Sequence, residues 1–165
     1  MIIYLFRHGL AIDRDDPECP PDPKRFLTRK GVEKTRAAAM GLRALGLAPE
    51  IILSSPYVRA MQTGELVAEA LEFPRARIVQ TDALLPPAGP AQLFKVLAKT
   101  KVAAVLCVGH APNLDEIIGY ALGANGSFTA LKKAGAACLE MESLSPGKGT
   151  LLWLHTPKSL RLLAG

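Results

Sequence analysis

Two arginines and two histidines in this sequence follow short apolar segments of the kind that form buried strands. Arg7 and His8 come directly after the first of these segments. Arg59 follows a second segment, and His110 follows a third. Because ligands of open α/β sheets bind outside the carboxyl ends of the strands, we expect these four side chains to share one pocket. Two guanidinium groups and two imidazoles in one pocket favour a negatively charged ligand.

The chemistry that suits this set of residues is phosphoryl transfer. An arginine next to a histidine disfavours a charged imidazole unless an anion compensates, and arginine forks match phosphate oxygens. Arg7, Arg59 and a protonated His110 would neutralise the charge on the phosphoryl oxygens without a metal. His8 would attack phosphorus as a neutral imidazole and form a phosphohistidine that water later cleaves. Gly9 would leave room for a close backbone approach beside this nucleophile.

Other phosphate chemistries lack their sequence signatures. The chain has no Walker A loop, no C-x5-R loop and no D-x-D pair near a strand end. Cys19, Cys107 and Cys138 form no C-x-x-C pair, and the last two lie in apolar segments. We interpret those two as buried small hydrophobic residues rather than metal or redox ligands. We therefore expect no metal and no cofactor.

The elements that must position the four residues alternate between short apolar segments and longer amphipathic ones, which is typical of an α/β domain with a largely parallel sheet. Thr28 is the expected cap of the first helix, and Gly46 its stop. The expected helices run from Thr28 to Leu45, Val58 to Leu71, Ala91 to Lys99 and Asn113 to Leu122. The expected strands are Ile2–Phe6, Ile51–Ser54, Arg77–Val79, Val102–Val108, Ala136–Met141 and Thr150–His155. The length of 165 residues without an interdomain linker predicts a single domain over residues 1–165.

Two proline-rich segments interrupt this pattern, Asp13–Arg25 and Leu84–Pro90. Neither a helix nor a central strand can run through the first of them. Its length favours a functional loop over a simple connector.

Composition excludes several classes of protein. With 49% apolar and 21% charged residues, the chain is too apolar to be disordered. Its net charge of +5 favours phosphorylated partners and is modest for a duplex-DNA binder. No aromatic residue alternates with the basic ones as in single-strand binders, so we expect no nucleic-acid partner. The apolar stretches are too short for a membrane span and the first residues do not form a leader, so we expect a cytoplasmic monomer without a membrane partner.

Several basic residues gather near the first loop and helix. We interpret them as a solvated helix face, with the steering of an acidic phosphorylated partner as the alternative. They are Lys24, Arg25, Arg29, Lys30, Lys34 and Arg36.

Taken together, the motifs resemble those of the histidine phosphatase superfamily, also called phosphoglycerate-mutase-like. The shared motifs are Arg7-His8-Gly9, Ser55-Pro56-x-x-Arg59-Ala60-x-x-Thr63 and Gly109-His110. The small size and three further segments are similar to SixA-type phosphohistidine phosphatases. Those segments are Arg25-x-Leu27-Thr28-x-x-Gly31, Leu85-x-Pro87 and Gly109-His110-x-Pro112-x-Leu114.

The resemblance covers essentially the whole chain in the right order. It implies a three-layer α/β/α sandwich around a mostly parallel central sheet. It also implies that His8 is the nucleophile and that Arg7, Arg59 and His110 form the phosphate pocket. Arg25 matches a further position that approaches the phosphate.

One departure from the superfamily concerns the proton donor. Larger members carry a mid-chain carboxylic acid that protonates the leaving group, but no Asp or Glu lies between Asp82 and Asp115 here. An imidazole leaves more readily than an alkoxide because its free pKa is about 6.5. The missing acid therefore favours phosphohistidine over sugar phosphates as substrate. Other candidate acids lie in the first loop, where we prefer a solvated, charge-balancing role: Asp13, Asp15, Asp16 and Glu18.

The leading hypothesis is a metal-independent phosphatase that hydrolyses phosphohistidine on a partner protein, such as a phosphotransfer domain, through a covalent intermediate on His8. A first alternative is a broad small-molecule phosphomonoesterase or a phosphoglycerate-mutase-like enzyme that uses the same pocket. A second alternative is a non-catalytic phosphate-binding module, although a pure binder would have no need of His8.

Overall fold

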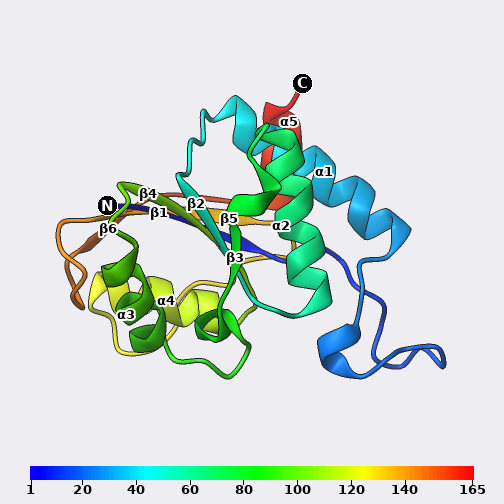
Figure 1. Cartoon of the computed structure of the whole chain (residues 1–165), viewed down its shortest axis with the longest axis horizontal. Helices are drawn as coiled ribbons and strands as arrows, with labels where there is room; N and C mark the ends of the chain where they lie inside the picture. Colours follow the sequence, from blue (N-terminus) through cyan, green and yellow to red (C-terminus); the bar gives the residue numbers. More distant parts are fainter.

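A computed structural model describes all residues 1–165, and its centre is one six-stranded sheet with helices on both faces (Figure 1). The strands are β1 (Ile2–Arg7), β2 (Ile51–Ser54), β3 (Ile78–Gln80), β4 (Ala104–Gly109), β5 (Ala136–Met141) and β6 (Gly149–His155). The helices are α1 (Arg29–Ala44), α2 (Val58–Ala70), α3 (Pro90–Thr100), α4 (Asn113–Leu122) and α5 (Pro157–Leu163). Short 3-10 helices are η1 (Asp22–Lys24), η2 (Arg75–Arg77) and η3 (Asp82–Leu84).

The strand order in the sheet is β3-β2-β4-β1-β5-β6. β1, β2, β3 and β4 are parallel to one another. β5 runs antiparallel to β1, and β6 antiparallel to β5. The expected, mostly parallel sheet is confirmed, with an antiparallel pair at one edge. That pair is antiparallel because a short turn joins β5 to β6, whereas parallel neighbours need a crossover.

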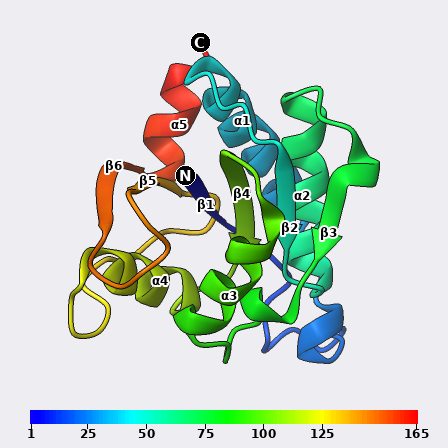
Figure 2. The same ribbon diagram turned by 60° about the vertical axis from the view of Figure 1, so that its left-hand side comes forward.

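The helices form two layers, which completes the expected three-layer α/β/α sandwich (Figures 1 and 2). α1, α2 and α5 cover one face of the sheet, and α3 and α4 cover the other. Each layer has its own apolar core, with Phe6 and Leu106 facing the first and Ile3 and Val105 the second. The alternation follows from the period of two along each strand. Strands buried on both faces explain why β1 and β4 have nearly continuous apolar sequences.

Most expected elements agree with the structure to within two residues. Thr28 caps α1 by accepting a hydrogen bond from Gly31 N at 3.0 Å, and Gly46 follows the helix with a φ of 75°. β3 starts one residue later than expected because residues up to Arg77 close a 3-10 turn. β4 begins at Ala104 instead of Val102, because Lys101 ends α3 in a left-handed conformation.

Two elements were not expected from the sequence. η1 is a single turn inside the proline-rich segment Asp13–Arg25. α5 is a short helix with one fully buried side chain, Leu160, so it has almost no apolar periodicity. Its signal was the pair Thr156-Pro157, because a threonine cap followed by a proline in the first turn is typical of a helix start.

Two smaller expectations concern single residues. Cys107 and Cys138 are buried, as expected. Trp153 is only partly buried, and it packs against the core beneath α1 and α2 from the edge strand β6. No helix has both the length and the apolar sequence required to cross a membrane.

Candidate active site

The carboxyl ends of β1, β2 and β4 lie side by side, and backbone hydrogen bonds hold them together. β1 and β4 are in register so that Arg7 faces Gly109, and His8 N donates to Gly109 O at 3.0 Å. Ser55 N donates to Val108 O at 2.9 Å, which continues the pairing of β2 with β4. This register places His8 and His110 next to each other, with ring centroids 5.0 Å apart. The prediction that strand ends bring the two histidines together is confirmed.

His8 is held in a defined orientation at the end of β1. Its Nδ1 lies 2.7 Å from Gly9 O. A carbonyl oxygen can only accept, so Nδ1 carries the proton, and Nε2 of the neutral ring keeps its lone pair. Arg59 Nε donates to that Nε2 at 3.4 Å. The residue is 7% exposed and lines the pocket.

Glycine is required at position 9 because α1 packs closely against the backbone there. The expected close approach of this backbone to a ligand stays a prediction. A Cβ at this position would lie 2.0 Å from Thr35 Oγ1 on α1. Gly9 N donates to Thr63 Oγ1 on α2 at 3.1 Å, and the same hydroxyl donates to Arg59 O at 2.7 Å. Thr63 therefore couples the turn after His8 to the helix that carries Arg59. This assigns a structural reason to the last residue of the Ser55-to-Thr63 motif.

Arg59 lies in the first turn of α2, near the helix N-terminus, as expected. Its side chain is 4% exposed, and it lies over the Tyr57 ring at 5.0 Å. Tyr57 in turn packs edge-on against His110 at 5.3 Å. The aromatic ring thus supports both the guanidinium and the second imidazole.

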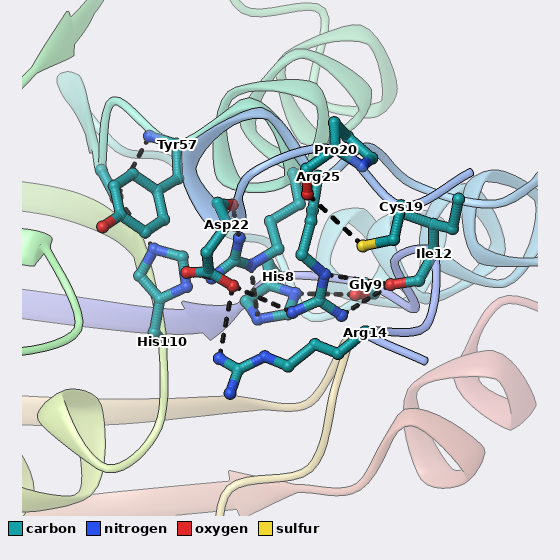
Figure 3. A network of polar contacts seen from close by, with 12 residues as sticks. His8, Gly9, Ile12, Arg14, Cys19, Pro20, Asp22, Arg25, Tyr57 and His110 are labelled. Carbon is teal, nitrogen blue, oxygen red and sulfur yellow. Dashed lines mark hydrogen bonds and ion pairs between the residues drawn. The ribbon is translucent and has the colours of Figure 1, made fainter. Parts of the chain in front are cut away.

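His110 is fixed by Ser55 from the neighbouring strand. Its Nε2 lies 2.8 Å from Ser55 Oγ, while its Nδ1 is buried and has no hydrogen-bond partner in the protein. Figure 3 shows one ring nitrogen of His110 directed toward Asp22 and His8. Protonation of His110 puts a proton on both ring nitrogens, so an acceptor atom of a ligand at Nδ1 would stabilise the protonated ring.

Arg7 is oriented by the segment before β5. Its Nη1 donates to Leu131 O at 2.8 Å, and its buried Nε has no partner. The buried Asp115 carboxylate accepts from Leu131 N at 2.8 Å and from Thr129 Oγ1 at 2.6 Å. Asp115 therefore anchors the segment that aims Arg7. It acts on Arg7 through the backbone and through its charge.

A hollow of about 320 Å³ joins these residues into one pocket. All five predicted site residues line it: Arg7, His8, Arg25, Arg59 and His110. Arg14 and Lys133 add two cations that were not predicted, and Pro86 is contributed by the proline-rich segment Leu84–Pro90. The excess of cations over the single lining carboxylate, Asp13, makes this a pocket for an anion.

The sequence reasoning missed Asp22, which accepts hydrogen bonds from three arginines at the rim of the pocket. Figure 3 shows Asp22 beside Arg14 and Arg25. Its Oδ1 accepts from Arg25 Nη1 at 3.0 Å and Arg14 Nη2 at 3.3 Å, and its Oδ2 accepts from Arg59 Nη2 at 3.2 Å. Its backbone oxygen also accepts from Arg59 Nη1 at 2.7 Å. The 3-10 turn η1 brings the carboxylate to this position. The signal in the sequence was the i,i+3 pair of Asp22 and Arg25 inside a loop thought to be functional.

Arg25 lies at the pocket, but its guanidinium is used by the loop. Besides the contact with Asp22, its Nε and Nη2 donate to Ile12 O at 3.1 and 2.6 Å. Arg25 therefore closes the loop after Ile12 and holds Asp22 against Arg59. All four candidate acids in this loop are exposed, and only Asp13 lines the pocket.

The two imidazoles are neutral in the ligand-free pocket. Burial, and then the charges of His110, Arg59 and Arg7, lower the pKa of His8 to about 2, although the Gly9 carbonyl opposes this. Burial, and then Arg59 and Arg7, lower the pKa of His110 to about 3, while Asp22 opposes this. A protonated His110, which was expected from the sequence, therefore requires an anion in the pocket. The pKa of Asp22 is also lowered, by Arg25 and Arg59 against its burial, so this carboxylate is ionised near neutral pH.

The structure brings no group of three or more His, Cys, Asp or Glu side chains together as a metal site would require. The groups that face the pocket are guanidinium and imidazole nitrogens. Their arrangement can hold a tetrahedral anion and place one neutral imidazole nitrogen beside it.

Comparisons with known proteins show which family the chain belongs to. The sequence profile of the histidine phosphatase superfamily (branch 1) matches residues 3–85. The chain is 40% identical over 140 residues, 82% of either chain, to an uncharacterised protein of Picosynechococcus sp.. It is 29% identical over 167 residues, 98% of either chain, to the phosphohistidine phosphatase SixA of Escherichia coli (strain K12). Its fold is similar to the solved structure of the protein histidine phosphatase SixA complexed with tungstate, with a TM-score of 0.84, 25% identity and coverage of 97% of this chain and 99% of the other.

The fold is thus that of the phosphoglycerate-mutase-like α/β proteins. The chain belongs to the histidine phosphatase superfamily (branch 1), and it is a phosphatase. The resemblance seen in the sequence motifs is confirmed.

Proposed function

We propose that this phosphatase, as one catalytic domain over residues 1–165, hydrolyses phosphohistidine on a partner protein through a covalent intermediate on His8 and without a metal. The observation that carries the proposal is the state of His8. The ring is neutral, Nδ1 donates to the Gly9 carbonyl, and Nε2 presents its lone pair between Arg59 and the pocket. That is the form of histidine that can attack phosphorus.

In the first step, the Nε2 lone pair of His8 forms a bond to phosphorus, and the bond from phosphorus to the substrate imidazole breaks. A substrate ring that is protonated on its other nitrogen departs as neutral imidazole and needs no proton from the enzyme. His8 keeps its Nδ1 proton on the Gly9 carbonyl throughout. The phosphorylated ring is therefore cationic, and its own phosphorus–nitrogen bond is activated for the second step.

In the second step, water attacks phosphorus, and the electrons of the phosphorus–Nε2 bond return to His8. The proton of the water passes to the phosphate or to solvent, and phosphate leaves. Arg7, Arg59 and His110 offset charge on the equatorial oxygens in both steps, a role that cationic groups fill in phosphoryl transfer. Arg7 Nε and His110 Nδ1 are the two buried nitrogens of the pocket that await acceptors.

The absence of an acid from the mid-chain segment supports phosphohistidine as the substrate, since the one carboxylate that lines the pocket is that of the exposed loop residue Asp13. The segment Leu84–Pro90 contributes Pro86 to the pocket but no carboxyl group. Asp22 lies close by but is ionised, because Arg25 and Arg59 hold its pKa below the usual value. An alkoxide leaving group relies on a positioned acid, whereas an imidazole does not. The relatives named for phosphohistidine or protein histidine phosphatase activity, which match nearly the whole chain, support the same substrate class.

A substrate panel tests the proposal. A phosphorylated histidine-phosphotransfer protein should be hydrolysed with a higher kcat/KM than 3-phosphoglycerate, sugar phosphates or p-nitrophenyl phosphate, and EDTA should not change the rate. His8→Gln should abolish turnover, and His155→Gln, which alters a histidine on the edge strand β6, should not. Faster turnover of the small phosphomonoesters would favour the broad phosphomonoesterase instead. Binding of phosphate without any turnover would favour the non-catalytic module.

A further inference from the structure

A second hollow lies next to the phosphate pocket, and cations dominate its lining. Its volume is about 490 Å³, and α1, α5 and the segment before β5 form its walls. No acidic residue lines it. The charged residues that line it are Lys34, Lys132, Lys133, Lys158 and Arg161.

These cations have no anionic partner within the protein. The ion pairs of the structure all lie elsewhere. On α1 itself, Arg29, Arg36 and Arg43 each pair with a glutamate, whereas Lys34 pairs with none. The basic residues of α1 therefore divide into arginines, which pair with glutamates, and lysines such as Lys34, which have no acidic partner. Crowded like charges repel one another, so an anionic ligand would stabilise the hollow.

The fold holds this hollow in place beside the catalytic strand. α5 lies against α1, where a Cβ at Gly41 would be 2.0 Å from the backbone oxygen of Leu160, so the backbones of the two helices are in close contact (Figure 2). Ala134 N donates to Arg7 O at 3.0 Å and to His8 O at 3.2 Å. The segment that carries Lys132 and Lys133 is therefore bonded directly to the end of β1.

Two residues line both the hollow and the phosphate pocket, Leu10 and Lys133. Leu10 is 37% exposed and forms an apolar surface between them. Burial, and then the charges of Arg7, Arg25 and Arg59, lower the pKa of Lys133. The positive field of the catalytic pocket therefore extends into the hollow.

The two sites differ in the kind of cation they use. Arginine lines the phosphate pocket at four positions, and its planar fork matches phosphate oxygens. The second hollow has four lysines and one arginine. A lysine is a compact point charge without a preferred bidentate partner, which suits scattered carboxylates. The apolar Leu10 between the two sites suits a polypeptide more than a nucleic acid or an inorganic anion.

We propose that this basic hollow is a docking site for acidic side chains of the phosphorylated partner protein, adjacent to its phosphohistidine. The inference rests on the proposed function and adds a feature of the substrate. While His8 reacts with the phosphoryl group, glutamate or aspartate side chains of the partner pair with Lys34, Lys132, Lys158 and Arg161. Leu10 contacts the chain that connects them.

Matched peptides test the proposal without a known partner. One phosphohistidine peptide carries glutamates beside the phosphohistidine, and the other carries glutamines at the same positions. The glutamate peptide should have a kcat/KM about tenfold higher, because several exposed ion pairs of modest strength add up. Added salt should reduce this preference, because exposed charges are screened. Equal kcat/KM values for the two peptides would overturn the proposal.

A charge-reversal pair of variants locates the effect. Lys34→Glu combined with Lys158→Glu should remove the preference for the glutamate peptide while turnover of p-nitrophenyl phosphate changes less than about twofold, since small substrates do not reach the hollow. Lys95→Glu combined with Lys99→Glu makes the same charge change on α3, on the opposite face of the sheet, and should keep the preference. Loss of the preference in both double variants would show a non-specific effect of net charge and contradict the docking site.

The outcomes separate this inference from the proposed function. If the native protein hydrolyses neither phosphohistidine peptide but cleaves small phosphomonoesters, the proposed function fails. If it hydrolyses both peptides equally, only the docking site fails. A single-stranded oligonucleotide that inhibits peptide hydrolysis where polyglutamate does not would identify a nucleic-acid surface and also overturn the docking site.

Discussion

Arg59 Nε lies 3.4 Å from His8 Nε2 and donates a hydrogen bond to it, while His8 Nδ1 lies 2.7 Å from Gly9 O. The two contacts leave the imidazole one proton and one lone pair, each at a defined nitrogen. In the mechanism that we propose, an incoming phosphoryl group accepts the Arg59 N–H, so that the His8 lone pair can reach phosphorus. The same guanidinium would then bind His8 Nε2 in the empty enzyme and the phosphoryl oxygens in the enzyme with substrate.

Catalysis should require the planar, two-pronged guanidinium group of Arg59 and not only its positive charge. Arg59→Ala should lower kcat/KM by about 100- to 1000-fold, the usual effect of removing a group that stabilises transition-state charge. Arg59→Lys should recover little of this, because an ammonium cannot bridge His8 and the phosphate as the planar fork does. Steady-state kinetics with a phosphohistidine peptide measure both variants. Arg36→Lys, at a half-exposed arginine that pairs with Glu69 outside the pocket, is the control and should retain activity.

Asp22 should compete with the substrate and not donate a proton to it. Its carboxylate binds Arg25 and Arg59, and its lowered pKa keeps it ionised at neutral pH. Asp22→Asn should therefore strengthen the inhibition by orthovanadate severalfold and leave kcat for phosphohistidine within about threefold, because the amide oxygen still accepts from the arginines and only the competing charge is removed. Titration of turnover with vanadate measures the first effect. A kcat that falls by orders of magnitude with unchanged vanadate inhibition would instead make Asp22 an acid catalyst.

Much of this site was predictable because buried strands, and the residues at which they end, can be recognised in a sequence. The residues Arg7, His8 and His110 directly follow apolar segments, and parallel neighbours place such ends together. Asp22 was not predictable in the same way, because its position depends on a 3-10 turn inside a proline-rich loop. Lys133 lies far along the chain, just before β5. It reaches the site only because β5 pairs antiparallel with β1, and the sequence has no signal for that pairing. Buried strands and helices have a regular spacing of apolar residues in the sequence, whereas side chains that pair across loops have no such spacing.

Most helices and strands were predictable for the same reason, and the elements that the sequence did not predict have physical causes. Helices such as α1 show a cap, an apolar face and a glycine stop. α5 is short and has only Leu160 fully buried, so neither its length nor an apolar periodicity predicts it. β6 is antiparallel to β5 because a short connection joins them, whereas the direction of β5 against β1 has no local signal in the sequence.

The empty pocket should make the protein less stable in mild acid. The folded-state pKa values of His8 and His110, about 2 and about 3, lie below the value near 6.5 that a free histidine has. Below about pH 6 the unfolded chain thus binds protons that the native protein does not, and the unfolding free energy falls by about 1.4 kcal/mol per pH unit for each histidine. The stability is fully present above the unfolded pKa and is lost as the pH falls.

Urea unfolding between about pH 6 and 4.5, above the range where carboxylates dominate, measures this slope. His110→Gln should reduce the contribution of the two histidines by about half. Saturating phosphate should also reduce the slope, because an anion favours the charged imidazoles. A slope that neither the substitution nor phosphate changes would contradict neutral histidines in the pocket.

Gly9 should be important for stability because α1 packs closely against it. In Gly9→Ala the new Cβ would meet Thr35 Oγ1 at 2.0 Å, and we expect a loss of about 1–3 kcal/mol in unfolding free energy from the overpacking. Thr35→Ala removes the unpartnered hydroxyl, so the double variant should regain part of that stability. Gly89→Ala is the matched control, because a Cβ there meets nothing within 4 Å. Equal losses for Gly9→Ala alone and with Thr35→Ala would show that the contact is not the cause.

The stereochemical course at phosphorus tests the covalent intermediate most directly. An aryl phosphorothioate made chiral with oxygen isotopes is hydrolysed by the native enzyme in isotopically labelled water, and the configuration of the thiophosphate product is determined. Transfer to His8 followed by transfer to water makes two inversions, so we predict overall retention of configuration. Overall inversion would mean that water attacks the substrate directly, and His8 would then not be the nucleophile.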